Sequence, residues 1–92
     1  MNITLEYHGQ LRHLAETDSE SREVKDGTSI PELVAMVAED YDEMFRAILL
    51  DESGALLPSA LILMGDEPVD RSDWPELKDG DVITLLPPIA GG

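Results

Sequence analysis

The sequence predicts an α+β fold in which a mixed sheet is covered by one main helix. Three observations predict it: alternating apolar residues over 2–7, an amphipathic helical pattern that starts at Ile30, and a continuous apolar run over 82–86. The 92 residues suffice for one domain with a modest core. We therefore expect a folded domain over residues 1–86 and an extended tail over residues 87–92.

The first part of the chain has the pattern of two strands joined by a short helix. Residues 2–7 alternate between apolar and polar, which is typical of a strand with one buried face. Residues 11–15 favour a short turn of helix, residues 20–24 a second strand, and Asp26-Gly27 a turn. The expected core face of the first strand consists of Ile3, Leu5 and Tyr7.

The main helix has a distinct start signal. Ser29 and Glu32 have the spacing of a capping box, and Pro31 lies in the first turn, where its missing N–H does no harm. Apolar residues then recur at helical spacing and leave Glu39 and Asp40 outside, which predicts an amphipathic helix of roughly three turns. The apolar stripe consists of Ile30, Leu33, Val34, Val37, Ala38 and Tyr41.

The segment after this helix is less regular. Residues 44–49 have the apolar spacing of a second short helix, and residues 51–54 indicate a turn. Residues 56–64 indicate an extended segment, in which Pro58 marks an edge or an irregular start.

The last part of the domain indicates two strands and two turns. Gly65-Asp66 places a glycine at the first central position, which suits a type II′ hairpin turn into residues 67–69. Asp79-Gly80 indicates a further turn before residues 82–86. The unbroken apolar character of this last strand predicts a central position in the sheet.

Composition excludes several classes of function. Twenty acidic residues against six basic ones give a net charge of −14, so we expect neither nucleic acid nor a membrane as a partner. The acidity either steers a basic protein partner to the surface or keeps the chain soluble, for example in a salty cytoplasm. The absence of cysteine excludes disulfides, thiolate metal sites and a cysteine nucleophile. Without a secretory signal or a membrane-length apolar run, a cytoplasmic protein is expected.

Other polar side chains favour structural roles. His8 and His13 share no helix face, so surface positions are favoured over a metal site. The acidic clusters lack the spacing of a calcium loop and are interpreted as solvated turns. Trp74 precedes a proline in a loop and is interpreted as a packing residue, with a recognition site as the alternative.

The most informative segment follows the last strand. Proline cannot continue a sheet ladder, so Pro87 and Pro88 should lead the chain away from the fold. Gly91 and Gly92 have no side chains, which lets an extended tail enter a narrow channel. The tail therefore presents its terminal carboxylate on a thin stalk beyond the domain.

That arrangement suits one reaction class. A separate enzyme can present ATP so that the carboxylate attacks the α-phosphate, and the acyl adenylate then accepts sulfide or an amine. The chain itself has no glycine-rich phosphate loop and no sizeable pocket, so we expect neither catalysis nor a bound cofactor. ATP and sulfide would be used by the activating enzyme. Because the chain has no cysteine, a persulfide is excluded and the terminus is the remaining place to carry sulfur.

Several segments resemble the MoaD/ThiS family of ubiquitin-like sulfur carriers, which includes the small subunit of molybdopterin synthase. The similar segments are Tyr7-His8-Gly9-Gln10-Leu11-Arg12-His13-Leu14-Ala15, Gly27-Thr28-Ser29-Ile30, Leu77-Lys78-Asp79-Gly80-Asp81, the strand at 82–86 and the tail Pro87-Pro88-Ile89-Ala90-Gly91-Gly92. The resemblance implies a ubiquitin-like β-grasp fold. The sequence departs from the family's pattern at two places. The family's usual Asn-Gly hairpin turn is Gly65-Asp66 here, and the segment over residues 45–58 is longer than in compact members. This longer form is more similar to archaeal-type members and to the carrier used in cysteine synthesis.

The resemblance also implies partners and site residues. An E1-like enzyme would adenylate Gly92, which becomes a thiocarboxylate, while Gly91, Ala90 and Ile89 form the passage of the tail. Sulfur would pass to molybdopterin with the large subunit of molybdopterin synthase, or to cysteine, thiamin or tRNA. The residues implied to contact partners, on the sheet face beside the tail, are Tyr7, Pro68, Leu86, Pro87 and Pro88. For Tyr7 and Leu86 a plain core position is the alternative.

Two other functions remain open. A ubiquitin-like modifier would use the same adenylate but end as an isopeptide between Gly92 and target lysines. Only Lys25 and Lys78 are available for self-linked chains. A plain interaction domain with an inert tail is the third interpretation.

Overall fold

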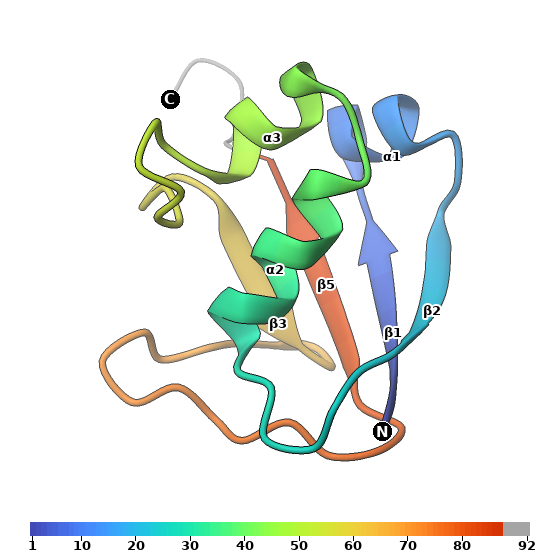
Figure 1. The fold of residues 1–92 in the computed structure, drawn as a ribbon, viewed down its shortest axis with the longest axis vertical. Helices are drawn as coiled ribbons and strands as arrows, with labels where there is room; N and C mark the ends of the chain where they lie inside the picture. The colour runs from blue at the N-terminus through green and yellow to red at the C-terminus, as the bar shows by residue number, and fades with distance from the viewer. Residues whose placement is uncertain (88–92) are drawn as a thin grey trace.

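A five-stranded mixed sheet, in the order β2-β1-β5-β3-β4, forms the framework of the protein (Figure 1). The structure is a computed structural model and describes residues 1–87. β1 and β5 are parallel at the centre, and the other neighbours are antiparallel, which confirms the predicted mixed sheet. The strands are β1 (Asn2–Tyr7), β2 (Ser19–Glu23), β3 (Leu61–Met64), β4 (Glu67–Pro68) and β5 (Val82–Leu86).

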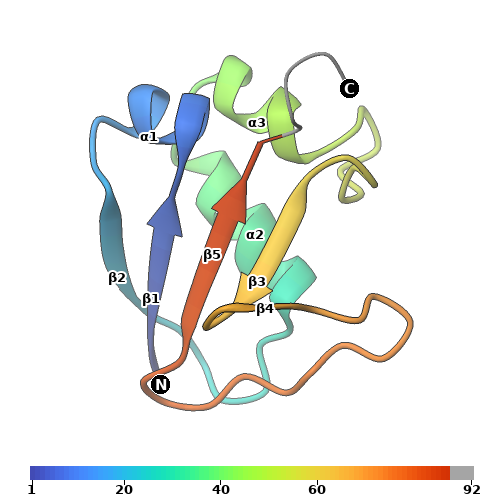
Figure 2. The same ribbon diagram turned by 180° about the vertical axis from the view of Figure 1, so that it is seen from behind.

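All the helices of the described residues lie over one face of this sheet. They are α1 (Gly9–Ala15), α2 (Ile30–Glu39) and α3 (Glu43–Leu49). α2 crosses the sheet, whereas α1 and α3 lie together near the end of the sheet where β5 finishes (Figure 1). Figure 2 shows the other face of the sheet without a helix over it. None of these helices is long and apolar enough to cross a membrane.

The predicted capping box starts α2. The Ser29 hydroxyl accepts a 3.2 Å hydrogen bond from the Glu32 N–H, and the Glu32 carboxylate accepts one of 3.1 Å from the Ser29 N–H. Such a cap satisfies two backbone donors that have no partner within the helix. The helix ends at Glu39, so the expected inclusion of Tyr41 in its stripe is wrong. Tyr41 still packs beside the core, because its ring stacks on that of Phe45 with the two ring centroids 4.4 Å apart.

The core lies between the sheet and the helices. β5 is central, as its sequence predicts: Ile83 and Leu85 are fully buried toward the helices, and even Thr84 on the other face is 5% exposed. The Thr84 hydroxyl donates a 3.3 Å hydrogen bond to Glu6 on β1. The largest fully buried side chains include Tyr7, Phe45, Ile3, Leu5, Leu11, Ile30, Leu33 and Leu49.

The segment before β3 is shorter and more irregular than predicted. Of residues 56–64, only Leu61–Met64 form a strand, and Leu56 makes an isolated bridge with Leu50. The guanidinium of Arg71 donates hydrogen bonds to the carbonyl oxygens of Leu57 and Ala60. Those carbonyls are therefore satisfied without a neighbouring strand, and the chain around Pro58 forms a turn.

The hairpin after β3 has the predicted turn. Gly65 has a φ of 62°, whereas Asp66 does not have a positive φ, as a type II′ turn requires. The following strand is limited to Glu67–Pro68, and the Val69 N–H beyond it donates a last hydrogen bond of 3.1 Å to the Ile62 carbonyl.

Candidate functional site: the open sheet face and the exit of the tail

The end of β5 is where the predicted tail leaves the sheet. Leu86, the last residue of the strand, pairs with Leu61 on β3, and Pro87 is the last residue that the structure describes. The predicted thiocarboxylate site Gly92, the passage residues 89–91 and the partner residue Pro88 lie outside the described residues. The structure therefore defines the root of the tail, and the roles of residues 88–92 stay predictions.

The root of the tail is packed against the start of α1. The His8 N–H donates a 3.2 Å hydrogen bond to the Leu85 carbonyl, which joins the end of β1 to the end of β5. Gly9 has a φ of 57°, and a Cβ atom there would lie 3.1 Å from Pro87 Cγ. A side chain at Gly9 would thus be strained in its backbone and too close to Pro87. This close approach sets where the chain leaves the sheet.

The uncovered face of the sheet carries an apolar strip that begins at the root of the tail. Cross-strand partners point to the same face, so the pairs Leu61–Leu86 and Leu63–Pro68 both lie on it. Leu61 is 42% exposed, Pro68 is exposed, and Leu63, Leu86 and Val82 are half-buried. We call these five residues the open apolar strip. Contiguous exposed apolar surface is where protein partners commonly dock, so this strip is a candidate docking surface.

Tyr7 does not belong to that strip. It is 2% exposed and lies on the helix-covered face, where its ring meets Phe45 and Tyr41 edge-on at 5.6 and 6.1 Å. Burial, followed by the hydrogen bond to Glu20, raises the pKa of Tyr7 above its ordinary value, so the hydroxyl stays a neutral donor. The implied position of Tyr7 beside Pro68 and Leu86 is wrong, and the alternative core position is correct. Alternation along β1 places Tyr7 on the face of Leu5.

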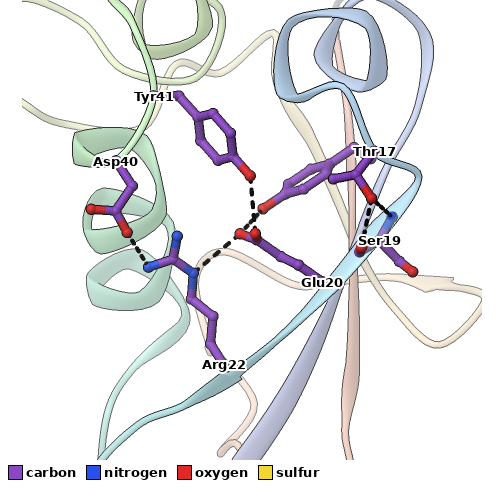
Figure 3. Close-up of polar contacts among 7 residues, drawn as sticks. Thr17, Ser19, Glu20, Arg22, Asp40 and Tyr41 are labelled. Carbon is purple, nitrogen blue, oxygen red and sulfur yellow. Dashed lines mark hydrogen bonds and ion pairs between the residues drawn. The ribbon is translucent and has the colours of Figure 1, made fainter.

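Glu20 holds a partly buried polar network that the sequence did not predict. Its carboxylate accepts hydrogen bonds of 2.6 Å from Tyr7, 3.0 Å from Tyr41 and 3.1 Å from Arg22 Nε. Arg22 also pairs with Asp40 at the end of α2 (Figure 3). The network ties the edge strand β2 to the helical layer. A usable sequence signal was present, because Glu20 and Arg22 are two residues apart and therefore share one strand face.

Two further expectations concern polar and aromatic surface residues. His8 and His13 are exposed, as expected. Within residues 1–87, no three His, Asp or Glu side chains are grouped so that they could hold a metal ion. Trp74 is half-buried and packs against the core, which agrees with the packing role.

The architecture and the strip together define a class of protein. A mixed sheet with parallel central strands, helices on one face and an apolar strip leading to the tail is the arrangement of a ubiquitin-like β-grasp domain. The ThiS family model matches residues 5–92, and the chain belongs to this family.

Individual relatives agree with this assignment. The molybdopterin synthase sulfur carrier subunit of Chlamydomonas reinhardtii is 24% identical over 92 residues, which are the whole of both chains. The crystal structure of SAMP1 from Haloferax volcanii matches with a TM-score of 0.84 at 15% identity, and the match covers the whole of this chain and the whole of SAMP1. At this identity the likeness supports the fold alone. The complex of subunits 1 and 2 of the molybdopterin-converting factor from Helicobacter pylori matches with a TM-score of 0.64 at 26% identity, and both matched chains are covered completely. As a small ubiquitin-like member of a carrier family, the chain is not an enzyme, as its sequence predicts.

Proposed function

We propose that the chain is a sulfur carrier whose Gly92 carboxylate is adenylated by an E1-like enzyme and converted to a thiocarboxylate. The thiocarboxylate donates its sulfur for molybdopterin biosynthesis, with the large subunit of molybdopterin synthase as the acceptor. Two likenesses support this: the relative named as a molybdopterin synthase sulfur carrier subunit aligns over the whole chain, and the relative from H. pylori is described in complex with its subunit 2. The family match extends through residue 92 and so includes the tail.

One structural observation carries the proposal. The open apolar strip begins at Leu86, and Pro87 follows directly at the root of the tail, where it packs against Gly9. A partner that covers Leu61 and Leu86 therefore contacts the domain directly beside Pro87, where the tail begins. Such docking supplies orientation, which lowers the barrier of a reaction that needs two groups aligned.

The chemistry divides between the chain and its partners. A carboxylate oxygen of Gly92 attacks the α-phosphorus of ATP, the bond to pyrophosphate breaks, and an acyl adenylate forms. Sulfide from a donor used by the activating system then attacks the carbonyl carbon, AMP leaves, and the thiocarboxylate remains. The chain contributes the carboxylate and the docking surface, while the activating enzyme contributes the ATP site.

The intact mass of the protein purified from its own host tests this proposal. We expect a population heavier by the replacement of one oxygen by sulfur, and we expect that population to disappear in a strain without the activating enzyme. In a strain without the molybdopterin synthase large subunit, the sulfur-bearing form should accumulate. Protein that carries no sulfur but is linked through Gly92 to lysines of other proteins would contradict the proposal and favour the modifier function.

A further inference from the structure

The turn that leads into β3 is held by a side chain from a distant loop. The Ala60 N–H donates a 3.1 Å hydrogen bond to the Leu57 carbonyl, which closes the turn over residues 57–60. The guanidinium of Arg71 donates to both ends of this turn, because Nη1 bonds to the Leu57 carbonyl at 2.9 Å and Nη2 bonds to the Ala60 carbonyl. Hydrogen bonds from a charged donor are stronger than neutral ones, so the double contact stabilises the turn.

Arg71 is itself fixed within its own loop. Asp70 Oδ1 accepts hydrogen bonds of 2.9 Å from the Ser72 N–H and 2.6 Å from the Ser72 hydroxyl. The Asp73 N–H donates a further bond of 3.1 Å to the Asp70 carbonyl. These bonds form a turn around Arg71, which is half-buried. One side chain therefore joins two irregular segments whose bonded residues are 11 and 14 positions apart.

The turn over residues 57–60 determines how the chain enters the open apolar strip. Ala60 is fully buried, whereas Leu61, the first residue of β3, is 42% exposed. The start of β3 lies beside the end of β5, where Leu61 pairs with Leu86 next to the root of the tail (Figure 2). Arg71 bonds to the carbonyl of the planar peptide group that joins Ala60 to Leu61, so it restrains the direction of that group.

We propose that Arg71 is a positioning residue for the docking of the activating enzyme. It acts through the turn over residues 57–60 and keeps Leu61 in place beside the root of the tail. A surface that is ordered before binding loses less conformational entropy when a partner covers it, so Arg71 strengthens docking without touching the enzyme. The inference rests on the proposed function, because it takes the activating enzyme as the protein that covers the strip.

Three variants separate the bonds made by Arg71 from its charge. Arg71→Gln removes the guanidinium, and Arg46→Gln removes the same charge from an exposed residue on α3. Arg71→Lys keeps the charge but replaces the planar guanidinium, which reaches both carbonyls, by a single ammonium group. If only the charge mattered, Arg71→Lys would behave as wild type and Arg46→Gln would behave as Arg71→Gln.

Amide hydrogen exchange of the full chain tests the positioning without any partner. We expect Arg71→Gln to speed the exchange of the Ala60 N–H by about tenfold, because this N–H closes the turn, while the amides of the central strand β5 keep their protection. Arg71→Lys should give an intermediate rate, and Arg46→Gln should match wild type. An Ala60 rate in Arg71→Gln equal to that in Arg46→Gln would overturn the inference.

The kinetics of activation test the docking role. In ATP–pyrophosphate exchange with the activating enzyme of the same host, we expect Arg71→Gln to raise the KM for the carrier about three- to tenfold with kcat unchanged. Arg71→Lys should raise the KM less, and Arg46→Gln should stay near wild type. A merely structural role would lower the stability of Arg71→Gln and leave the KM of the folded chain as in the control. If Arg71→Gln does not fold, the KM of Arg71→Lys against that of wild type decides instead.

The two proposals fail in different ways. If the wild-type chain is not activated at all, the sulfur-carrier proposal fails and the docking role fails with it. If the wild type is activated but Arg71→Gln has the KM of Arg46→Gln, or loses kcat at an unchanged KM, the carrier proposal stands and the positioning role is wrong.

Discussion

The hydroxyl of Tyr7 donates a 2.6 Å hydrogen bond to the carboxylate of Glu20, which links strand β1 to the edge strand β2 on the helix-covered face of the sheet. Glu20 lies opposite Leu5 in the register of the two strands, so a charged group is held at the margin of an apolar face. The bond explains how that carboxylate is tolerated, because a partly buried charge is costly unless it is hydrogen-bonded.

Replacing Tyr7 by Phe should test whether this residue is structural. We expect Tyr7→Phe to lower the free energy of unfolding by about 1–2 kcal/mol, because Glu20 loses a short hydrogen bond while the ring is kept. Tyr41→Phe, which removes the longer 3.0 Å bond of a less buried ring, is the matched control and should cost less. Urea unfolding measures both. If Tyr7→Phe kept full stability but slowed activation, Tyr7 would act in a partner contact after all.

Glu20 should also give the protein a specific dependence of stability on pH. Burial alone would raise the pKa of Glu20, but hydrogen bonds from Tyr7, Tyr41 and Arg22 outweigh it and hold the pKa below its ordinary value of 4.5. The unfolded state therefore binds the proton more readily, and the stabilisation by Glu20 is present above pH 4.5 and lost as the pH falls through the folded-state pKa.

The measurement is the difference in unfolding free energy between wild type and Glu20→Gln from neutral to acidic pH. Taking the difference cancels the contribution of the other carboxylates. We expect an advantage of the wild type that shrinks in acid. An advantage that stayed constant or grew in acid would show that the Glu20 pKa is not lowered by folding.

The open apolar strip should affect binding and not stability. Leu61→Gln changes a side chain that is 42% exposed, so the free energy of unfolding should shift by no more than about 0.5 kcal/mol. Because the residue pairs with Leu86 at the root of the tail, we expect the affinity for the activating enzyme to fall about tenfold. Calorimetric titration measures that affinity.

Met44→Gln is the matched control for this experiment. Met44 is 59% exposed on α3, on the helical side of the protein, and its substitution should leave the affinity unchanged. Equal losses in both variants would mean that the partner does not distinguish the two faces, and the strip would not be the docking surface.

The elements that the sequence predicted correctly are those whose signals are local. Periodicity gave β1 and β5, and the spacing of Ser29 and Glu32 gave the start of α2. The end of this helix was missed because Tyr41 continues the apolar spacing, although the chain turns away after Glu39. Apolar spacing records which residues are buried and does not by itself say where the backbone leaves the helix.

The parts that the sequence did not predict depend on contacts between distant residues. Arg71 bonds to carbonyls 11 and 14 residues earlier, and this replaced the long strand expected before β3. Tyr41 reaches Glu20 across 21 residues, so the local spacing of Glu20 and Arg22 does not by itself identify the other partners of the network. For Tyr7, the alternation of β1 already placed the side chain with the core, whereas the family resemblance placed it with the partner face; the local pattern was correct.

Activation of variants of the tail tests whether the carboxylate of Gly92 is the reactive group. Wild type, a chain without Gly92 and a chain with one glycine added after it are each incubated with the activating enzyme, ATP and a sulfide donor. Intact mass then measures thiocarboxylate formation. One residue displaces the carboxylate by about 3.3–3.6 Å, which is far more than an aligned reaction tolerates.

We predict that only the wild type gains sulfur, while the unfolding free energies of all three chains agree within about 0.5 kcal/mol. This agreement separates loss of activation from loss of the fold. Thiocarboxylate formation at a wild-type rate on the chain without Gly92 would show that the reactive terminus does not depend on that residue, and the sulfur-carrier proposal for Gly92 would fail.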